Sequence, residues 1–155
     1  MKKTNAIRIL ETHGVKFNFA AYEFSENEID AESVAAKLKL NPEKVFKTLV
    51  TVGNDKNNYV FVIPGNYELN LKKAAAASVV KKIELIKMKE LQNLTGYIRG
   101  GCSPIGMKKH FPTFIDESAQ LFDEIYISAG VRGMQISISP TDLAEIVNAK
   151  FCDLI

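Results

Sequence analysis

The chain has 155 residues, of which 46% are apolar and 25% are charged, and its formal net charge is +2. This length suits one domain with its own core, and the composition is that of a soluble globular protein. No apolar run approaches the roughly 20 residues that a membrane helix needs. The basic N-terminus is followed by Arg8 and Glu11 instead of the apolar stretch of a signal peptide. We therefore expect a single cytoplasmic domain spanning residues 1–155, without membrane contact.

The charges and cysteines narrow the range of partners and ligands. The lysines are interleaved with eighteen acidic residues, a pattern typical of solvated faces, and a protein that wraps duplex nucleic acid is usually more basic. Light contact with one end of an RNA stays open. Cys102 and Cys152 are the only two cysteines, and with His13 and His110 they lack the spacing of a zinc site. We expect no disulfide framework, no metal and no cofactor.

The N-terminal half alternates between helix and strand signals. Thr4 and Asp30 stand at N-cap positions before helical spacings of apolar residues. The stretch GNDKNN separates two β-branched, apolar runs and predicts a hairpin loop. The predicted elements are a helix over 4–14, a strand in the stretch 17–24 that ends near Tyr22, a helix over 31–40, a short helical turn from Pro42, and strands over 45–52 and 59–64.

The C-terminal half contains more strands than helices. The predicted elements are a helix over 71–79 capped by Asn70, a short strand over 82–86, a short helix over 88–94, strands over 113–115, 124–128 and 134–139, and a helix over 140–148. Several predicted hairpins are adjacent in sequence, which argues against a doubly wound parallel sheet. We predict an α+β fold in which helices surround one curved, mixed, mostly antiparallel and barrel-like sheet.

Lys47 interrupts the apolar run VFKTLVTV (45–52). In a strand its side chain shares a face with Val45 and Leu49. It can be an edge-strand lysine that limits aggregation or a snorkelling side chain. It can also be an ammonium held in a cleft, where it attracts a phosphate or a developing oxyanion. The residues alone leave these three interpretations open.

The stretch GYIRGGCSPIG (96–106) holds four of the nine glycines. Adjacent glycines let the backbone approach a ligand closely, and successive amides can form an anion-binding concavity. The stretch lacks both the phosphate-loop pattern and the dinucleotide fingerprint. A plain connecting loop and a ligand-binding loop remain equal alternatives.

Three side chains near these segments invite catalytic or binding roles. Cys102 has no base evident in the sequence, so a buried structural thiol is the favoured interpretation over a nucleophile. Tyr22 ends a predicted strand, where packing is the more common role. Ser128 precedes Ala129 and Gly130 and is either a turn residue or a hydroxyl that faces a cleft.

Three blocks of the chain resemble the YbaK/EbsC family of free-standing aminoacyl-tRNA deacylases. The blocks are VFKTLV (45–50), GYIRGGCSPIG (96–106) and IYISAGVRGMQI (125–136), in the family's order and spacing, and the resemblance runs over essentially the whole chain. The family is related to the editing insertion domain of bacterial prolyl-tRNA synthetases. The resemblance therefore implies an editing-domain fold.

The resemblance implies trans-acting removal of cysteine from tRNA(Pro), with Cys-tRNA(Cys) as a further substrate. A second site that destroys the wrong product is needed because binding alone separates similar small substrates poorly. The implied partners are the aminoacylated acceptor end of tRNA and prolyl-tRNA synthetase, and the oligomeric state is not indicated. By motif, the resemblance assigns catalytic roles to Lys47 and Gly101, and substrate-binding roles to Tyr22, Gly100, Ser103, Pro104 and Ser128.

In the mechanism that the family implies, the thiol of the bound cysteine attacks its own ester carbonyl. This step releases tRNA and a small cyclic thioester, and it exploits the large effective molarity of an intramolecular reaction. The amides of Gly100 and Gly101 would face the developing oxyanion. Lys47 would face the terminal phosphate, the ribose or the same oxygen.

Two departures from the family pattern bear on substrate preference. Gln135 stands where many members have an acidic residue, and Ile29 and Asp30 stand near the place of a loop aromatic found in some members. Two alternatives are therefore kept. One is a hydrolase of Ala-tRNA(Pro), and the other is a non-catalytic module that binds the tRNA acceptor end or a synthetase.

Overall fold

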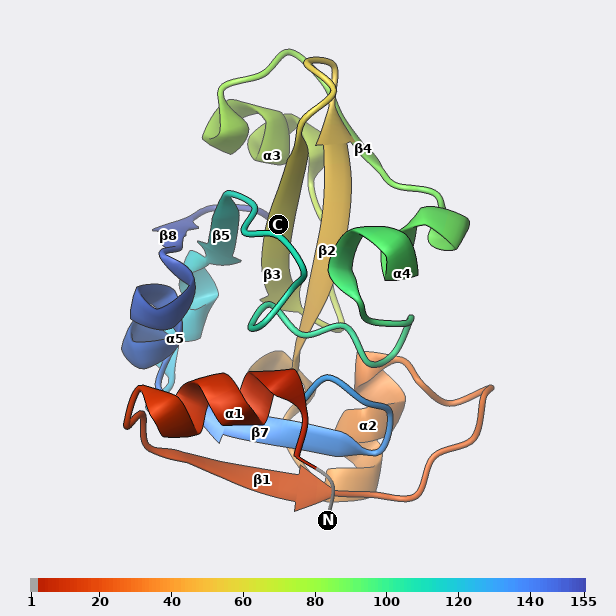
Figure 1. Cartoon of the computed structure of the whole chain (residues 1–155), viewed down its shortest axis with the longest axis vertical. Coiled ribbons are helices and arrows are strands. Elements are labelled where there is room, and N and C mark those ends of the chain that lie inside the picture. Colours follow the sequence, from red (N-terminus) through yellow and green to blue (C-terminus); the bar gives the residue numbers. More distant parts are fainter. Residues whose placement is uncertain (1–2) are drawn as a thin grey trace.

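The computed structural model describes residues 3–155, which form two β-sheets surrounded by five α-helices (Figure 1). The helices are α1 (Asn5–Thr12), α2 (Ala31–Leu38), α3 (Leu71–Ser78), α4 (Met88–Thr95) and α5 (Pro140–Val147), with 3-10 turns at Pro42–Lys44 and Glu117–Leu121. The strands are β1 (Phe17–Ala21), β2 (Phe46–Gly53), β3 (Asn58–Pro64), β4 (Ile83–Leu85), β5 (Thr113–Asp116), β6 (Ile125–Ser128), β7 (Met134–Ile138) and β8 (Lys150–Cys152).

Local sequence signals account for most of these elements. Every predicted helix and strand is present, with its ends within three residues of the prediction. The predicted caps act as expected, because the side chains of Thr4, Asp30 and Asn70 accept hydrogen bonds from amides in the first turns of α1, α2 and α3. Strand β8 and the turn at Glu117–Leu121 were not predicted, since both are short and lack a periodic pattern.

The strands divide between two open sheets. The small sheet has the order β1-β7-β6 and is antiparallel, whereas the large sheet has the order β4-β2-β3-β5-β8 and is mixed. Within the large sheet, β5 pairs in parallel with both β3 and β8. The prediction of α+β structure with mainly antiparallel pairing is confirmed. The expectation of one barrel-like sheet is not, because β4 and β8 end the large sheet and β1 and β6 end the small one.

The two sheets meet at the start of β2. Val45, immediately before this strand, forms a parallel bridge with Tyr126 of β6. On the edge of β2 that faces away from β3, β4 pairs with β2 only at Thr51–Gly53. Within residues 3–155, the edge of β2 from 46 to 49 therefore has no strand partner opposite β3. This gap in the hydrogen-bonded ladder decides where a ligand can reach the backbone.

Two larger core clusters stabilise the sheets, and two smaller ones flank the open edge of β2. One large cluster packs α1 and α5 against isoleucines of β6 and β7, and the other packs α3 against Phe61 and Ile63 of β3. The smaller clusters join α2 to Val45 and join Leu91 of α4 to Val50. A fully buried Leu or Ile contributes about 1.5–3 kcal/mol, so these contacts hold α2 and α4 on either side of the gap.

None of the helices in residues 3–155 has the length and apolar character needed to span a bilayer.

The contact between Gly65 and α2 yields a first prediction. A Cβ added at Gly65 would overlap the Cβ of Ala31 and lie 3.1 Å from the carbonyl oxygen of Val45. We expect Gly65→Ala to lower the free energy of unfolding by about 1–3 kcal/mol, the usual cost of overpacking. Urea denaturation measures this change.

The double variant Gly65→Ala/Ala31→Gly is the matched control for this prediction. It removes the methyl group that the new side chain meets, so it should recover part of the lost stability. A double variant no more stable than Gly65→Ala would show that this contact is not the cause.

Candidate active site

A cleft of about 470 Å³ lies along the open edge of β2. One wall is the loop before α2 together with the start of that helix, from Ile29 to Val34. The other wall is the β4–α4 segment, from Leu85 to Leu91. Arg99, Gly100 and Cys102 of the glycine-rich loop complete the lining, with Ser128 and Gln135 at the facing ends of β6 and β7. In Figure 1, α2 and α4 lie on the same side of β2, below and above this region.

Lys47 is half-buried in this cleft. Burial lowers the pKa of its ammonium, and the carboxylates of Glu68, Glu32 and Asp30 oppose that shift. Lys47 forms no salt bridge with any residue of the described part of the chain. The result is a partly desolvated cation that is available to an anionic or carbonyl ligand.

The glycine-rich loop is held by its own hydrogen bonds. The hydroxyl of Tyr97 donates to the carbonyl oxygen of Ile105 at 2.6 Å, and the amide of Ile105 donates to Oγ of Ser103 at 3.2 Å. The Gly101 amide donates to the carbonyl oxygen of Ile98 at 2.9 Å. Gly100 has a φ of +81°, a conformation that favours glycine. The loop therefore presents a defined backbone to the cleft.

Arg132 ties this loop to the turn after β6. Its Nε donates to the carbonyl oxygen of Arg99 at 2.8 Å. A Cβ added at Gly101 would lie 3.1 Å from backbone atoms of both Val131 and Arg132. Two backbone segments thus approach each other closely at Gly101, and a side chain there would have to displace one of them slightly.

The structure brings together only some of the side chains predicted as site residues. Lys47, Gly100 and Ser128 line the cleft. Ser103 and Pro104 are buried behind the loop and are not among the lining residues. The Gly101 amide, one of the two predicted oxyanion donors, already donates a hydrogen bond to the carbonyl oxygen of Ile98. The Gly100 amide, the other predicted donor, makes no backbone hydrogen bond within residues 3–155.

Tyr22 lies outside the cleft. It packs against α2 and Val45 in one of the small clusters that flank the open edge. It also lines a separate, shallow hollow together with Phe24 and Lys37. In this structure Tyr22 supports the wall formed by α2, and direct contact with a substrate stays a prediction.

Cys102 faces the cleft, but it is poorly suited to nucleophilic attack. Burial raises the pKa of its thiol to about 12, against a smaller opposing effect from a hydrogen bond with Thr95. A thiol with that pKa is protonated at neutral pH, and the thiolate is the nucleophilic form. This agrees with the sequence-based interpretation of Cys102 as a structural thiol.

Two polar lining residues escaped the sequence analysis as site candidates. Within the described residues, Oγ1 of Thr48 and Oε1 of Gln135 are buried without a hydrogen-bond partner. The Gln135 side chain is only 5% exposed, and an unpaired buried polar group costs about 1–3 kcal/mol. A bound ligand can supply the missing partners. Gln135 was noted only as a departure from the family pattern, and its burial could not be predicted because MQISIS has the alternation of a strand with one solvated face.

Comparison with known proteins identifies the family. The model of the aminoacyl-tRNA editing domain matches residues 25–146. The chain belongs to the aminoacyl-tRNA editing domain family. EbsC of Enterococcus faecalis, described as a candidate Cys-tRNA(Pro)/Cys-tRNA(Cys) deacylase, is 50% identical over 153 residues, which cover 99% of this chain and 93% of that protein. The resemblance noted from the three sequence blocks is thereby confirmed.

Solved structures of similar fold agree with this assignment. A candidate trans-editing enzyme for prolyl-tRNA synthetase superposes with a TM-score of 0.82 at 25% identity and covers 99% of this chain, which in turn covers 98% of that structure. The hypothetical protein APE2540 superposes with a TM-score of 0.89 at 22% identity, over 97% of this chain and 99% of the other. The second likeness shows the editing-domain fold alone.

The buried ammonium of Lys47 yields a second prediction. Because burial holds its pKa in the folded chain below the ordinary value of 10.5, the folded state binds this proton less tightly than the unfolded state. The charged form therefore reduces stability below the folded pKa, and the reduction vanishes above the unfolded pKa. We expect Lys47→Met to be at least as stable as the wild type at pH 7, with the difference narrowing as the pH rises toward 10.5.

Urea denaturation at several pH values measures this difference. The exposed Lys16 and Lys150, each changed to Met, are the controls, and neither should show the same trend. A Lys47→Met variant that is less stable than the wild type at pH 7 would contradict the prediction.

Proposed function

We propose that this protein is a trans-acting deacylase that removes cysteine from mischarged tRNA(Pro), with Cys-tRNA(Cys) as a second substrate. Membership of the editing-domain family and the 50% identity with EbsC support an aminoacyl-tRNA substrate. The observation that carries the proposal is the unpaired, half-buried ammonium of Lys47 in a cleft lined by the Gly100 backbone. A cation and a backbone amide in a shielded cleft are suited to an ester carbonyl that gains negative charge.

The proposed reaction uses the thiol of the substrate. The sulfur of the bound cysteine forms a bond to its own carbonyl carbon, the ester C–O bond breaks, and the electron pair goes to the terminal ribose oxygen. The thiol proton ends on that oxygen, so the products are tRNA with a free hydroxyl and a cyclic thioester. Water then opens the thioester to give free cysteine. The intramolecular step needs no protein nucleophile, and the raised pKa of Cys102 fits that requirement.

The protein's contribution is position and charge. Lys47 stabilises the oxygen of the tetrahedral intermediate, and the Gly100 amide is free to donate to the same oxygen. Removing one such group typically lowers kcat by about a hundredfold to a thousandfold. The unpaired oxygens of Thr48 and Gln135 accept hydrogen bonds from the polar groups of the bound ester. Ser128 is less available, because its Oγ accepts from the Gly130 amide at 3.1 Å.

A deacylation assay on two charged tRNAs tests this function. We expect the purified protein to release cysteine from Cys-tRNA(Pro) and to leave Ala-tRNA(Pro) largely intact, because alanine has no thiol. Lys47→Met should lower kcat/KM on Cys-tRNA(Pro) by about a hundredfold or more. Equal turnover of the alanyl ester would point to attack by water. Unchanged deacylation by Lys47→Met, together with weaker tRNA binding, would indicate a non-catalytic acceptor-end module.

The lining thiol gives a further prediction. Cys102→Ala should retain the wild-type kcat/KM on Cys-tRNA(Pro) within about threefold, since a thiol that stays protonated contributes little nucleophilicity. The same assay measures it, and Cys152→Ala serves as the control for loss of a thiol outside the cleft. A loss of several hundredfold in Cys102→Ala alone would show that the protein thiol takes part in the reaction.

A further inference from the structure

The two chain segments that contain the walls of the cleft carry opposite charge. Residues 23–32, which lead into α2, contain five carboxylates and no cation. Asp30 lines the cleft, and Glu32 acts on Lys47 from the first turn of α2. Residues 81–99, which form β4, α4 and the start of the glycine-rich loop, contain five cations and two carboxylates. The cations are Lys81, Lys82, Lys87, Lys89 and Arg99.

Most of the cations of residues 81–99 are unpaired in the part of the chain that the structure describes. Lys82 pairs with Glu84 at 3.0 Å, and the other four form no salt bridge within residues 3–155. Lys87 and Lys89 flank Met88, which lines the cleft, and both are exposed. Arg99 lines the cleft itself and is also exposed. Within the described part of the chain, Arg99 is therefore an unpaired cation of the cleft lining, and Lys87 and Lys89 are unpaired cations next to a lining residue.

The β4–α4 wall also exposes apolar side chains. Leu85 is 56% exposed and Met88 is 55% exposed, although both line the cleft. Large apolar side chains left open beside a cluster of cations are a marker of a binding surface. A nucleotide matches this combination, because its base is a flat apolar surface and its phosphate is an anion.

We propose that the charge difference sets the direction in which aminoacyl-tRNA lies across the cleft. The acceptor strand enters over the β4–α4 wall, with the base of the terminal adenosine against Leu85 and Met88. Its phosphates lie near Lys87, Lys89 and Arg99. The α-ammonium of the aminoacyl group points to the acidic wall at Asp30. This orientation rests on the proposed function.

The opposite orientation is electrostatically unfavourable. It would set the phosphates of the acceptor strand toward Asp30 and the acidic segment 23–32, and the α-ammonium toward Lys87, Lys89 and Arg99. Like charges juxtaposed in this way are a common source of discrimination at interfaces. In the proposed orientation the ester carbonyl lies between the two walls, where Lys47 and Gly100 line the cleft. A cleft of about 470 Å³ is also within the usual size range for a bound small ligand.

The test compares the double variant Lys87→Gln/Lys89→Gln and the single variant Arg99→Gln with two substrates. One substrate is Cys-tRNA(Pro), and the other is the cysteinyl ester of adenosine, which has the base but no phosphate. We expect the ratio of kcat/KM on the tRNA to kcat/KM on the ester to fall about tenfold, because phosphate contacts are lost. The dependence of log(kcat/KM) on log[salt] for the tRNA should become shallower by about one for each cation removed.

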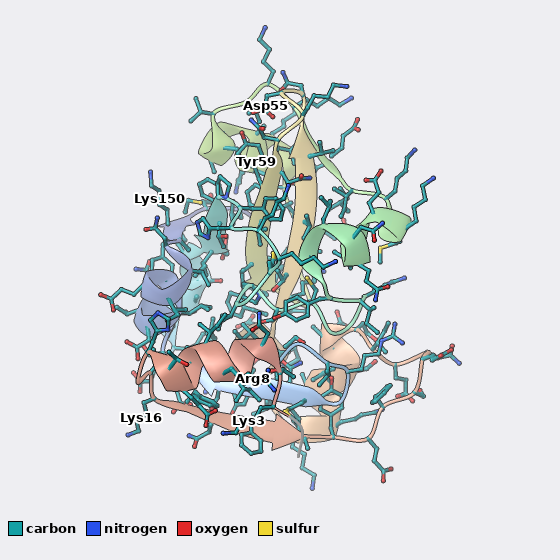
Figure 2. The ribbon with its side chains drawn as sticks, in the orientation of Figure 1. Lys3, Arg8, Lys16, Asp55, Tyr59 and Lys150 are labelled. Atoms are coloured by element: carbon teal, nitrogen blue, oxygen red, sulfur yellow. The ribbon has the colours of Figure 1, made fainter. Side chains whose placement is uncertain are left out.

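The control is the double variant Lys16→Gln/Lys150→Gln, which removes two exposed lysines that lie away from α4 (Figure 2). A Lys87→Gln/Lys89→Gln variant that behaves like this control would overturn the orientation. So would a larger effect from Glu26→Gln/Glu28→Gln in the acidic segment before α2. Leu85→Ser should raise KM for both substrates by about tenfold, because both carry the base. A KM that is unchanged for both would remove the adenosine contact.

Direct binding separates this inference from the proposed function. Fluorescence anisotropy with an uncharged tRNA(Pro) acceptor minihelix needs no turnover. If the wild type binds this RNA but does not deacylate Cys-tRNA(Pro), the proposed function fails, and the lysine variants still report the side of entry. If the wild type deacylates and the variants bind and react like the control, only the orientation fails.

Discussion

The site depends on a missing strand pairing. β2 is bridged to the small sheet at Val45 and covered by β4 from Thr51 onward, which leaves a short edge without a partner. Exposed strand edges invite unwanted pairing, and a charged side chain is a common safeguard. In this protein Lys47 lies on that edge, and α2 and the β4–α4 segment stand on either side of it. The sequence left open whether Lys47 protects a strand edge or provides a cation in a cleft. In the structure the unpaired edge lines the cleft, so the two interpretations are compatible.

The charge of Lys47 and the unpaired polar groups distinguish the cleft from the rest of the surface. Burial lowers the pKa of Lys47, while nearby carboxylates help to keep it charged. The cation is therefore maintained at a cost in stability, as is common where a group is preorganised for function. Among the described residues, two further lining residues, Thr48 and Gln135, have a buried side-chain oxygen without a hydrogen-bond partner. A ligand that satisfies these groups gains more than it would in water, because the surroundings are partly desolvated.

Backbone packing supplies the precision that this chemistry needs. The glycine-rich loop is held by Tyr97 from within and by Arg132 from the turn after β6. Gly101 permits two backbones to approach closely, and Gly100 adopts a conformation that other residues avoid. Small displacements of a positioned group can strongly reduce the rate of an intramolecular reaction. In the proposed reaction, attack by the substrate's own thiol depends on the position of this loop.

The amino-acid sequence by itself determined the local elements of this protein and the family to which it belongs. Side-chain caps, the GNDKNN hairpin and the anomalous Lys47 are all encoded within a few residues, and the motif blocks pointed to the editing family that the comparisons confirm. Only the tertiary structure decided that the strands form two open sheets, because the pairing of β5 with β3 and β8 joins segments far apart in the chain. The tertiary structure also decided that the Gly101 amide bonds to Ile98, that Tyr22 packs outside the cleft, and that the Gln135 oxygen is buried. Those outcomes depend on which surfaces pack together, and no local pattern of residue types specifies that.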